Sequence, residues 1–340
     1  MMNNNINNGA TNNNNNNNEL NGGKMIMVNG RVENLVAFGE VVKGAIEELC
    51  TDCMVSVNEV TKNNGLTLTG ITIKSKDSNL APTIYLNDMY KEYLAGASLG
   101  EIVNRVIKVY QENRVHNDFD VSAITDFDRV KSRICFKLVN AERNVALLKT
   151  VPYVEFHDLA VVFYILLSCD AGGNATVTVK NEMLDIWGIN DINDLNELAK
   201  RNTTRLMRAT VNSMFEVVMG IVADHPDSID KDIVDSLFDM NVYEDSVAPM
   251  FVATNKQKLQ GSCVMLYDGL LATFAERIGG DFFVLPSSVH ELIFVPCNGM
   301  DADNLLDMVG CVNATEVSVD EFLSNHIYRY DSVNDSLEMI

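Results

Sequence analysis

The hydrophobic pattern at the start of the chain predicts a helix followed by a small sheet. Apolar residues recur at helical spacing over residues 32–49. Apolar and polar residues then alternate over residues 54–75 on both sides of Asn64-Gly65, which is a strong signal for a β-hairpin. The stretch PTIYL, residues 82–86, predicts a third strand.

Two further helices are predicted before residue 150. Ser98 and Glu101 have the spacing of a capping box, and the residues that follow are amphipathic at helical spacing. The stretch DFDRVKSRICFKLVNAERNVALL, residues 126–148, is also interpreted as a helix. Together with the hairpin, these elements predict a self-contained unit of helices and strands.

The second part of the chain opens with a continuous apolar run, LAVVFYILL, at residues 159–167. Such a run is typical of a strand that is buried on both faces. The alternating strand ATVTVKN and the helix NDLNELAKRNTTRLM follow it. The remaining pattern predicts the strands MFVAT, DFFVL and ELIFV, the helices DGLLATFAERIG and ADNLLDMVGCV, and a closing hairpin, HIYRYDSVNDSLEMI.

These elements predict an α+β protein of two mixed units, with largely antiparallel sheets and flanking helices. We expect the first unit to span residues 25–149 and the second to span residues 150–340. Residues 1–24 are predicted to be a disordered tail, because the Asn-rich start of the chain cannot bury apolar surface. Residues 224–247 are markedly acidic and predict an amphipathic surface helix.

Charge restricts the classes of partner. The chain has 47 Asp and Glu residues against 26 Lys and Arg residues, which gives a formal net charge of -21. Such a charge opposes a polyanion, so we expect neither direct nucleic-acid binding nor attachment to an anionic membrane. Acidic mimicry of nucleic acid, directed at a DNA-handling enzyme, stays open as a third hypothesis.

The seven cysteines predict a reducing compartment, because most of them lie within apolar stretches as core thiols do. The pair Cys50 and Cys53 closes a predicted helix, where the helix dipole opposes thiolate formation. We therefore interpret both as reduced cysteines. No secretory signal opens the chain, and no apolar run approaches the ~20 residues that span a bilayer. We expect a cytoplasmic protein.

The stretch VLPSSVHELIFVP contains the residue types of a hydrolase, namely Ser287, Ser288, His290 and Glu291. On a strand, His290 and Glu291 point to opposite faces. Ser288 and Glu291 also have capping-box spacing, which favours a structural turn. Two interpretations therefore remain: a turn between core strands, or a site in which His290 acts as a general base.

Two stripes of polar residues are candidate ligand contacts. On the predicted helix over residues 126–148, one face carries Arg133, Lys137, Asn140 and Asn144. A later helix carries Arg201 and Arg205 on one face. The alternative is pairing with the many carboxylates of the chain. No phosphate-binding glycine loop, nucleophile elbow or set of metal ligands is found, so we expect no cofactor and no metal.

Several stretches together resemble a family of uncharacterised bacterial proteins that is frequent in anaerobic gut bacteria. They include VTKNNGLTLTGITI, FDVSAITDFDRVKSRICFKLVNAERN, VPYVEFHDLAVVFYILL, VLPSSVHELIFVP and NATEVSVDEFLSNHIYRYD. The resemblance covers nearly all of the chain except the Asn-rich tail. It implies one intact protein of two α+β units, and it implies no particular chemistry.

The first hypothesis for function is a non-catalytic binding or regulatory module for a protein or a small-molecule partner. It depends on the lack of a complete catalytic constellation in the sequence. The alternative is a hydrolase-like enzyme of unfamiliar type, in which His290 is the general base.

Overall fold

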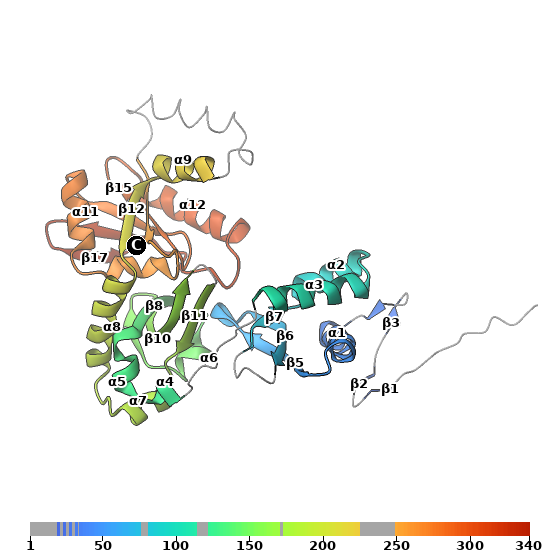
Figure 1. Ribbon diagram of the computed structural model, residues 1–340. Coiled ribbons are helices and arrows are strands. Elements are labelled where there is room, and N and C mark those ends of the chain that lie inside the picture. Colours follow the sequence, from blue (N-terminus) through green and yellow to red (C-terminus); the bar gives the residue numbers. More distant parts are fainter. Residues whose placement is uncertain are drawn as a thin grey trace, which may run out of the picture. The chain divides into compact units, whose positions relative to one another are not determined.

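A computed structural model of the chain divides into two compact units, each of which combines helices with antiparallel strands (Figure 1). Unit 1 consists of Met1–Val60 and Thr67–Phe119, and unit 2 consists of Thr61–Leu66 and Asp120–Ile340. The structure describes residues 34–75, 81–113, 122–170, 173–224 and 249–340, and the pairs 19–20, 23–24, 27–28 and 31–32. The Asn-rich stretch 1–18 and most of the predicted acidic segment lie outside these residues. The α+β class is confirmed.

Unit 1 packs helices against a sheet of order β5-β6-β7. Its core joins Phe38 and Ile46 of the first helix to Ile71 and Ile73 of the middle strand. The strands are β5 (Cys53–Thr61), β6 (Thr67–Ser75) and β7 (Thr83–Tyr85). The helices are α1 (Leu35–Leu49), α2 (Asn87–Ala95) and α3 (Leu99–Glu112). Four short strands precede them: β1 (Glu19–Leu20), β2 (Gly23–Lys24), β3 (Met27–Val28) and β4 (Arg31–Val32).

Two local signals that predicted elements of unit 1 are confirmed. Asn64 and Gly65 have φ angles of 57° and 71°, and they turn the chain between β5 and β6 within η1 (Asn63–Gly65). The Ser98 hydroxyl accepts a hydrogen bond from the Glu101 amide at 3.2 Å, and the Glu101 carboxylate accepts from the Ser98 amide at 2.8 Å. This capping box starts α3 at the predicted residue because it pairs amides that have no partner within the helix.

The first sheet of unit 2 is built on β10 (Leu159–Asp170), which contains the predicted apolar strand. Strand β8 (Ile134–Asn140) pairs with one edge of β10, and β9 (Tyr153–Phe156) and β11 (Gly173–Thr178) pair with the other, all antiparallel. The neighbouring residues Phe163 and Tyr164 point to opposite faces, and both are buried. The prediction of a strand that is buried on both faces is therefore confirmed.

The predicted helix over residues 126–148 is wrong. Only short helical turns flank a strand here: α5 (Phe127–Val130), η2 (Lys131–Arg133), β8 and α6 (Val145–Leu148). Ile134, Phe136 and Leu138 alternate along β8 and are fully buried in the main core. Pairing with β10 satisfies the backbone groups of alternate residues of β8. On its other edge, the Thr203 hydroxyl accepts from the Phe136 amide and the Asn202 side chain donates to the Ile134 carbonyl, so tertiary context decides the conformation of β8.

Strand β8 also places the boundary between the two units earlier in the chain than the sequence predicted. We predicted a boundary at residues 149 and 150. Because β8 pairs with β10, it belongs to a sheet of unit 2, and the division falls between Phe119 and Asp120.

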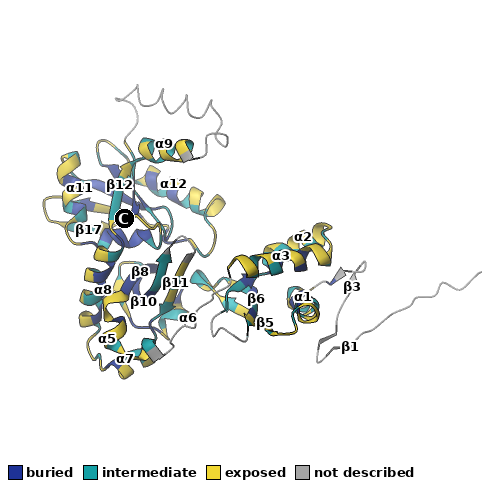
Figure 2. Ribbon diagram, in the orientation of Figure 1, coloured by how far each residue is buried: buried dark blue, intermediate teal, exposed yellow. Residues whose placement is uncertain are grey.

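The second sheet of unit 2 has the strand order β12-β13-β15-β14-β16-β17, with every neighbouring pair antiparallel. Phe282 and Phe294 face the main core, while Phe283 and Val295 face the helix that covers the other side. Figure 2 shows the buried strands and the exposed outer sides of the helices. The strands are β12 (Ala209–Ser213), β13 (Phe251–Asn255), β14 (Phe282–Pro286), β15 (Leu292–Pro296), β16 (Tyr328–Asp331) and β17 (Ser336–Met339).

Helices of unit 2 cover both sheets, and three of the longer ones, α8, α11 and α12, were predicted from their patterns. Elements α2, α7, α9, β9 and β12 were not predicted. None of the helices in the described ranges is long and apolar enough to cross a membrane. The helices are α4 (Ser122–Thr125), α7 (Asn181–Trp187), α8 (Ile192–Leu206), α9 (Met214–Asp224), η3 (Gly261–Leu266), α11 (Leu270–Ile278) and α12 (Ala302–Thr315).

The interpretation of Cys50 and Cys53 as two reduced thiols is wrong. A disulfide joins them across the turn between α1 and β5. The turn brings the two Cα atoms to 5.6 Å, a separation that a disulfide can bridge. The other five cysteines are free thiols.

Asp281 ties the closing hairpin of β16 and β17 to β14, and this contact predicts a pH-dependent contribution to stability. The amide and the hydroxyl of Ser332, followed by the Arg329 guanidinium, lower the pKa of the Asp281 carboxyl to about 2 from 3.8. A lowered pKa stabilises the fold above the unfolded value, and this stabilisation is lost as the pH falls from about 4 to about 2.

We expect Asp281→Asn to lower the free energy of unfolding at pH 7 by on the order of 1 kcal/mol, since solvent screens this partly exposed carboxylate. The difference from the wild type should shrink below pH 4. This difference is measured by urea unfolding of the two proteins, monitored through the fluorescence of Trp187, the single tryptophan, which lies in unit 2. A difference that stays constant from pH 7 to pH 2.5 would contradict the assigned role.

Candidate functional site

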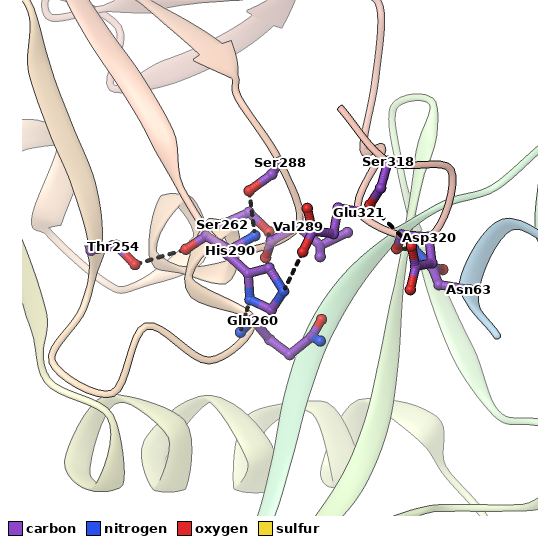
Figure 3. Close-up of polar contacts among 10 residues, drawn as sticks. All are labelled: Asn63, Thr254, Gln260, Ser262, Ser288, Val289, His290, Ser318, Asp320 and Glu321. Carbon is purple, nitrogen blue, oxygen red and sulfur yellow. Dashed lines mark hydrogen bonds and ion pairs between the residues drawn. The ribbon is translucent and has the colours of Figure 1, made fainter. Parts of the chain in front are cut away.

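The predicted serine, histidine and glutamate cluster lies in the turn between β14 and β15, and Figure 3 shows its members Ser288 and His290. The Ser288 amide donates to the Glu291 carbonyl at 3.2 Å, and the Ser288 hydroxyl accepts from the His290 amide at 3.0 Å. The Ser287 hydroxyl donates to the Glu291 carboxylate at 3.4 Å. No helix begins here, so the turn forms without the predicted capping box, and both serines are engaged in local hydrogen bonds.

The half-buried His290 ring is tied to the backbone by Nδ1, which accepts from the Gln260 amide at 3.3 Å (Figure 3). In the neutral ring the proton therefore sits on Nε2, which lies 4.0 Å from a Glu321 carboxylate oxygen. A general base needs a lone pair that is open to a substrate. The neutral ring already uses its lone pair on the Gln260 amide, so this arrangement favours the structural interpretation of His290.

The basic residues of the two predicted stripes do not form one site. Because β8 is a strand, Arg133 and Lys137 do not share a helix face with Asn140 and Asn144. The Arg133 guanidinium donates to the Leu167 carbonyl at 3.1 Å.

On helix α8, the Arg205 guanidinium donates to the Ser132 carbonyl at 2.7 Å, and Arg201 is exposed. On β8, burial lowers the pKa of the Lys137 ammonium group, and the positive charge of Lys62 lowers it further by a smaller amount. Arg133 and Arg205 thus have structural roles as donors to main-chain carbonyls.

Asn140 and Asn144 are both buried, and they shape the chain where β8 ends. The Asn140 side chain accepts from the Arg143 amide at 2.9 Å and donates to the Leu323 carbonyl at 3.0 Å. The Asn144 side chain donates to the Asn140 carbonyl at 2.9 Å and to Asn64 at 2.8 Å. These contacts fix the tight turn after β8 against the segment between α12 and β16.

A pocket of about 270 Å³ opens at this turn, entirely within unit 2. Three segments line it: the turn after β8, the turn between β9 and β10, and the segment that leads into β16. The lining residues are Asn140, Ala141, Glu142, Arg143, Asp158, Phe322, Asn325 and His326. His290 is not among them, so the predicted polar asparagines and the predicted base do not share this pocket.

Asp158 lines the pocket and accepts two hydrogen bonds from other residues of unit 2. It sits in a two-residue turn whose other member, His157, has a φ of 52°, an uncommon conformation for a residue other than glycine. The Asp158 carboxylate accepts from the Ser324 hydroxyl at 2.6 Å and from the Tyr328 hydroxyl. Burial, and then the bond to Asp158, raise the pKa of Tyr328. Two donors thus fix the orientation of this carboxylate.

Arg143 supplies the positive charge of the pocket. Its guanidinium lies 3.5 Å from the centre of the Phe322 ring, a cation–π contact. Within the described ranges, no ion pair and no hydrogen bond occupies the guanidinium nitrogens. Since guanidinium carries five donors in a planar fork, Arg143 can bind a carboxylate or a phosphate through two parallel hydrogen bonds.

His326 adds an imidazole ring to the lining of the pocket. Its Nδ1 lies 3.3 Å from the main-chain oxygen of Ile340, so Nδ1 carries a proton. In the neutral ring Nε2 is then an acceptor. Among the described residues, no group of three or more His, Cys, Asp or Glu side chains is placed to hold a metal ion.

Reasoning from the sequence missed Arg143, Asp158, Phe322 and His326 as site residues, although it nominated the neighbouring Asn140. The sequence did contain a signal that could have pointed to these residues, namely the stretches that resemble the family. All of these residues lie in three of the stretches that carry the family resemblance: FDVSAITDFDRVKSRICFKLVNAERN, VPYVEFHDLAVVFYILL and NATEVSVDEFLSNHIYRYD. Only the tertiary structure brings these stretches together.

The turn that holds His290 predicts a strict requirement for glycine at position 261. A Cβ atom on Gly261 would lie 2.2 Å from the His290 carbonyl oxygen and 2.1 Å from the Thr254 hydroxyl. We expect Gly261→Ala to lower the free energy of unfolding by ~1–3 kcal/mol, as for other overpacked sites. Gly280→Ala is the matched control, because a Cβ there meets nothing within 4 Å. Equal stability of the two variants in urea unfolding would refute the close packing.

The contacts of Asp158 predict a large effect of neutralising it. Asp158→Asn replaces an acceptor of two hydroxyl hydrogen bonds by an amide that also donates, so we expect a loss of about 1.5–3 kcal/mol in the free energy of unfolding. Glu142→Gln, in the same pocket but exposed, should change stability by less than about 0.5 kcal/mol. Trp187 fluorescence in urea reports both values, and equal effects would count against the network.

The comparisons with known proteins identify a family and no activity. A family model with the description "Family of unknown function (DUF5688)" matches residues 36–332. No curated protein and no solved structure matches the chain. The match spans both units and includes every residue that lines the pocket. The chain therefore belongs to this family of unknown function.

Proposed function

We propose that this protein is a non-catalytic binding protein that holds a small molecule by its carboxylate or phosphate group in the pocket at Arg143. The observation that carries the proposal is the Arg143 guanidinium, which stacks on Phe322 and has no acceptor for its donors within the described ranges. Stacking leaves the edge of the guanidinium plane open to a ligand and restricts the orientation of the side chain before binding.

The size and lining of the pocket support a small ligand. Its volume of about 270 Å³ lies just below the range of about 300–1,000 Å³ typical of ligand pockets, which suits a small metabolite. Hydrogen bonds join the three segments that form the walls: Asn140 donates to the Leu323 carbonyl, and the Ser324 hydroxyl donates to Asp158. A preformed site avoids the cost of ordering its walls when the ligand arrives.

Binding is favoured over hydrolysis by the state of the candidate base. His290 Nδ1 accepts a backbone hydrogen bond, and the nearby serines are bonded within their own turn. We further propose a cytoplasmic setting. The five free cysteines support it, and the Cys50–Cys53 disulfide is the exception.

The proposal predicts that a carboxylate or phosphate ligand depends on Arg143. We would screen a set of small carboxylates, phosphate esters and inorganic phosphate for a rise in the melting temperature, and then measure affinity by titration calorimetry. Arg143→Gln should weaken the binding of the best ligand by about tenfold to a hundredfold, the usual contribution of a bidentate charged contact.

Arg277→Gln is the matched control. Arg277 also lies over a phenylalanine ring, with 5.8 Å between its guanidinium and the centre of Phe251, but it is not among the residues of the pocket. Its replacement should leave the affinity unchanged. The proposal fails if no compound of the set binds in a way that depends on Arg143, or if both variants lose affinity equally.

A further inference from the structure

The pocket contains opposite charges, and this feature narrows the class of ligand. Arg143 contributes a cation, while Asp158 and Glu142 contribute carboxylates to the same lining. Among the described residues, Arg143 forms no ion pair with either carboxylate, although nitrogen–oxygen distances of up to 4.0 Å count as ion pairs. Arg143 and these carboxylates therefore line one pocket without pairing with each other, which leaves each available to a ligand group of opposite charge.

Asp158 keeps acceptor capacity after its structural contacts are made. A carboxylate has about four lone-pair positions, and the hydroxyls of Ser324 and Tyr328 occupy two of them. Ser324 and Tyr328 are both fully buried, so their hydroxyls orient the carboxylate from within the protein, and Asp158 also lines the pocket. Asp158 is half-buried, so an attraction to a ligand cation is less screened here than on the open surface.

A pocket lined by both positive and negative side chains disfavours ligands that carry a charge of only one sign. A simple anion on Arg143 is repelled by Asp158 and Glu142, and a simple cation near these carboxylates is repelled by Arg143. A ligand with both charges satisfies both sides. Repulsion of the wrong ligands contributes to specificity in the same way as attraction of the right one.

We infer that the pocket takes a small zwitterion of the amino-acid class, with its carboxylate on Arg143 and its ammonium group on Asp158. This inference rests on the proposed function and names the ligand class of that same pocket. His326 lines the same pocket, and in the tautomer that donates from Nδ1 to Ile340 its Nε2 is an acceptor that offers the ammonium group a second partner.

The test compares zwitterions with matched compounds that lack one charge. Glycine, γ-aminobutyrate and 6-aminohexanoate vary the separation between the two charges. The corresponding carboxylic acids without the amine, and the amines without the acid, are the matched compounds. Titration calorimetry of the wild-type protein should give at least one amino acid that binds about tenfold or more tightly than both of its matched compounds, the usual size of one charge-assisted hydrogen bond.

Two variants assign the charges. Asp158→Asn should reduce the preference for the amino acid over the matched acid to less than about twofold, and Arg143→Gln should do the same for the preference over the matched amine. A ratio of affinities within one protein does not depend on how much of a weakened variant is folded. Tyr328→Phe controls for disruption of the network, because it removes one hydroxyl bond to Asp158 and keeps the carboxylate. It should retain the preference for the amino acid.

The possible results separate the inference from the proposed function. If carboxylates or phosphates bind through Arg143 with no gain from an ammonium group, the pocket is an anion site and the zwitterion inference is wrong. If Tyr328→Phe loses the preference as completely as Asp158→Asn, the carboxylate is not the ammonium partner and the inference is also wrong. If no compound binds in a way that depends on Arg143, the proposed function falls as well.

Discussion

The carboxylate of Asp158 is the contact on which the architecture of unit 2 around the pocket depends. Tyr328 is fully buried on β16, and a buried phenol needs an acceptor for its proton. Asp158 provides that acceptor from the turn between β9 and β10, and it also binds the buried Ser324. One side chain thus joins the first sheet of unit 2 to strand β16 of the second sheet. The unusual backbone of His157 beside it is accommodated because these contacts hold the turn in place.

The pocket is a consequence of this junction. Where the two sheets meet, the turn after β8 and the segment before β16 are connected by side chains that bond to main-chain groups, such as Asn140 to the Leu323 carbonyl. Those bonds pair the polar groups that point into the protein. The exposed Arg143 guanidinium lies over the Phe322 ring instead. The candidate chemistry therefore lies between segments, as expected for loops positioned by a rigid scaffold. The turn that holds His290 shows the opposite case, since its polar side chains are used to shape the turn itself.

Parts of the fold could be predicted because the sequence encodes them locally. The capping box of Ser98 and Glu101 and the turn at Asn64 and Gly65 depend on residues that are close in the chain. The prediction failed at β8, where a basic and polar pattern with helical spacing concealed an alternation of Ile134, Phe136 and Leu138. The helical spacing of its charges was coincidental. The burial of every second residue against the core was the physical cause of the conformation.

The sequence by itself determined the α+β class, the doubly buried strand β10 and most of the strands and helices that follow it, because periodicity and turn residues act over a few positions. Only the tertiary structure decided that β8 joins β10 and that Arg143, Asp158 and His326 line one pocket. These residues are separated along the chain by up to 183 positions, as in the bond between Asn140 and Leu323. No local pattern records which distant segments will meet, because that choice depends on how the whole core packs and on which buried polar groups find partners.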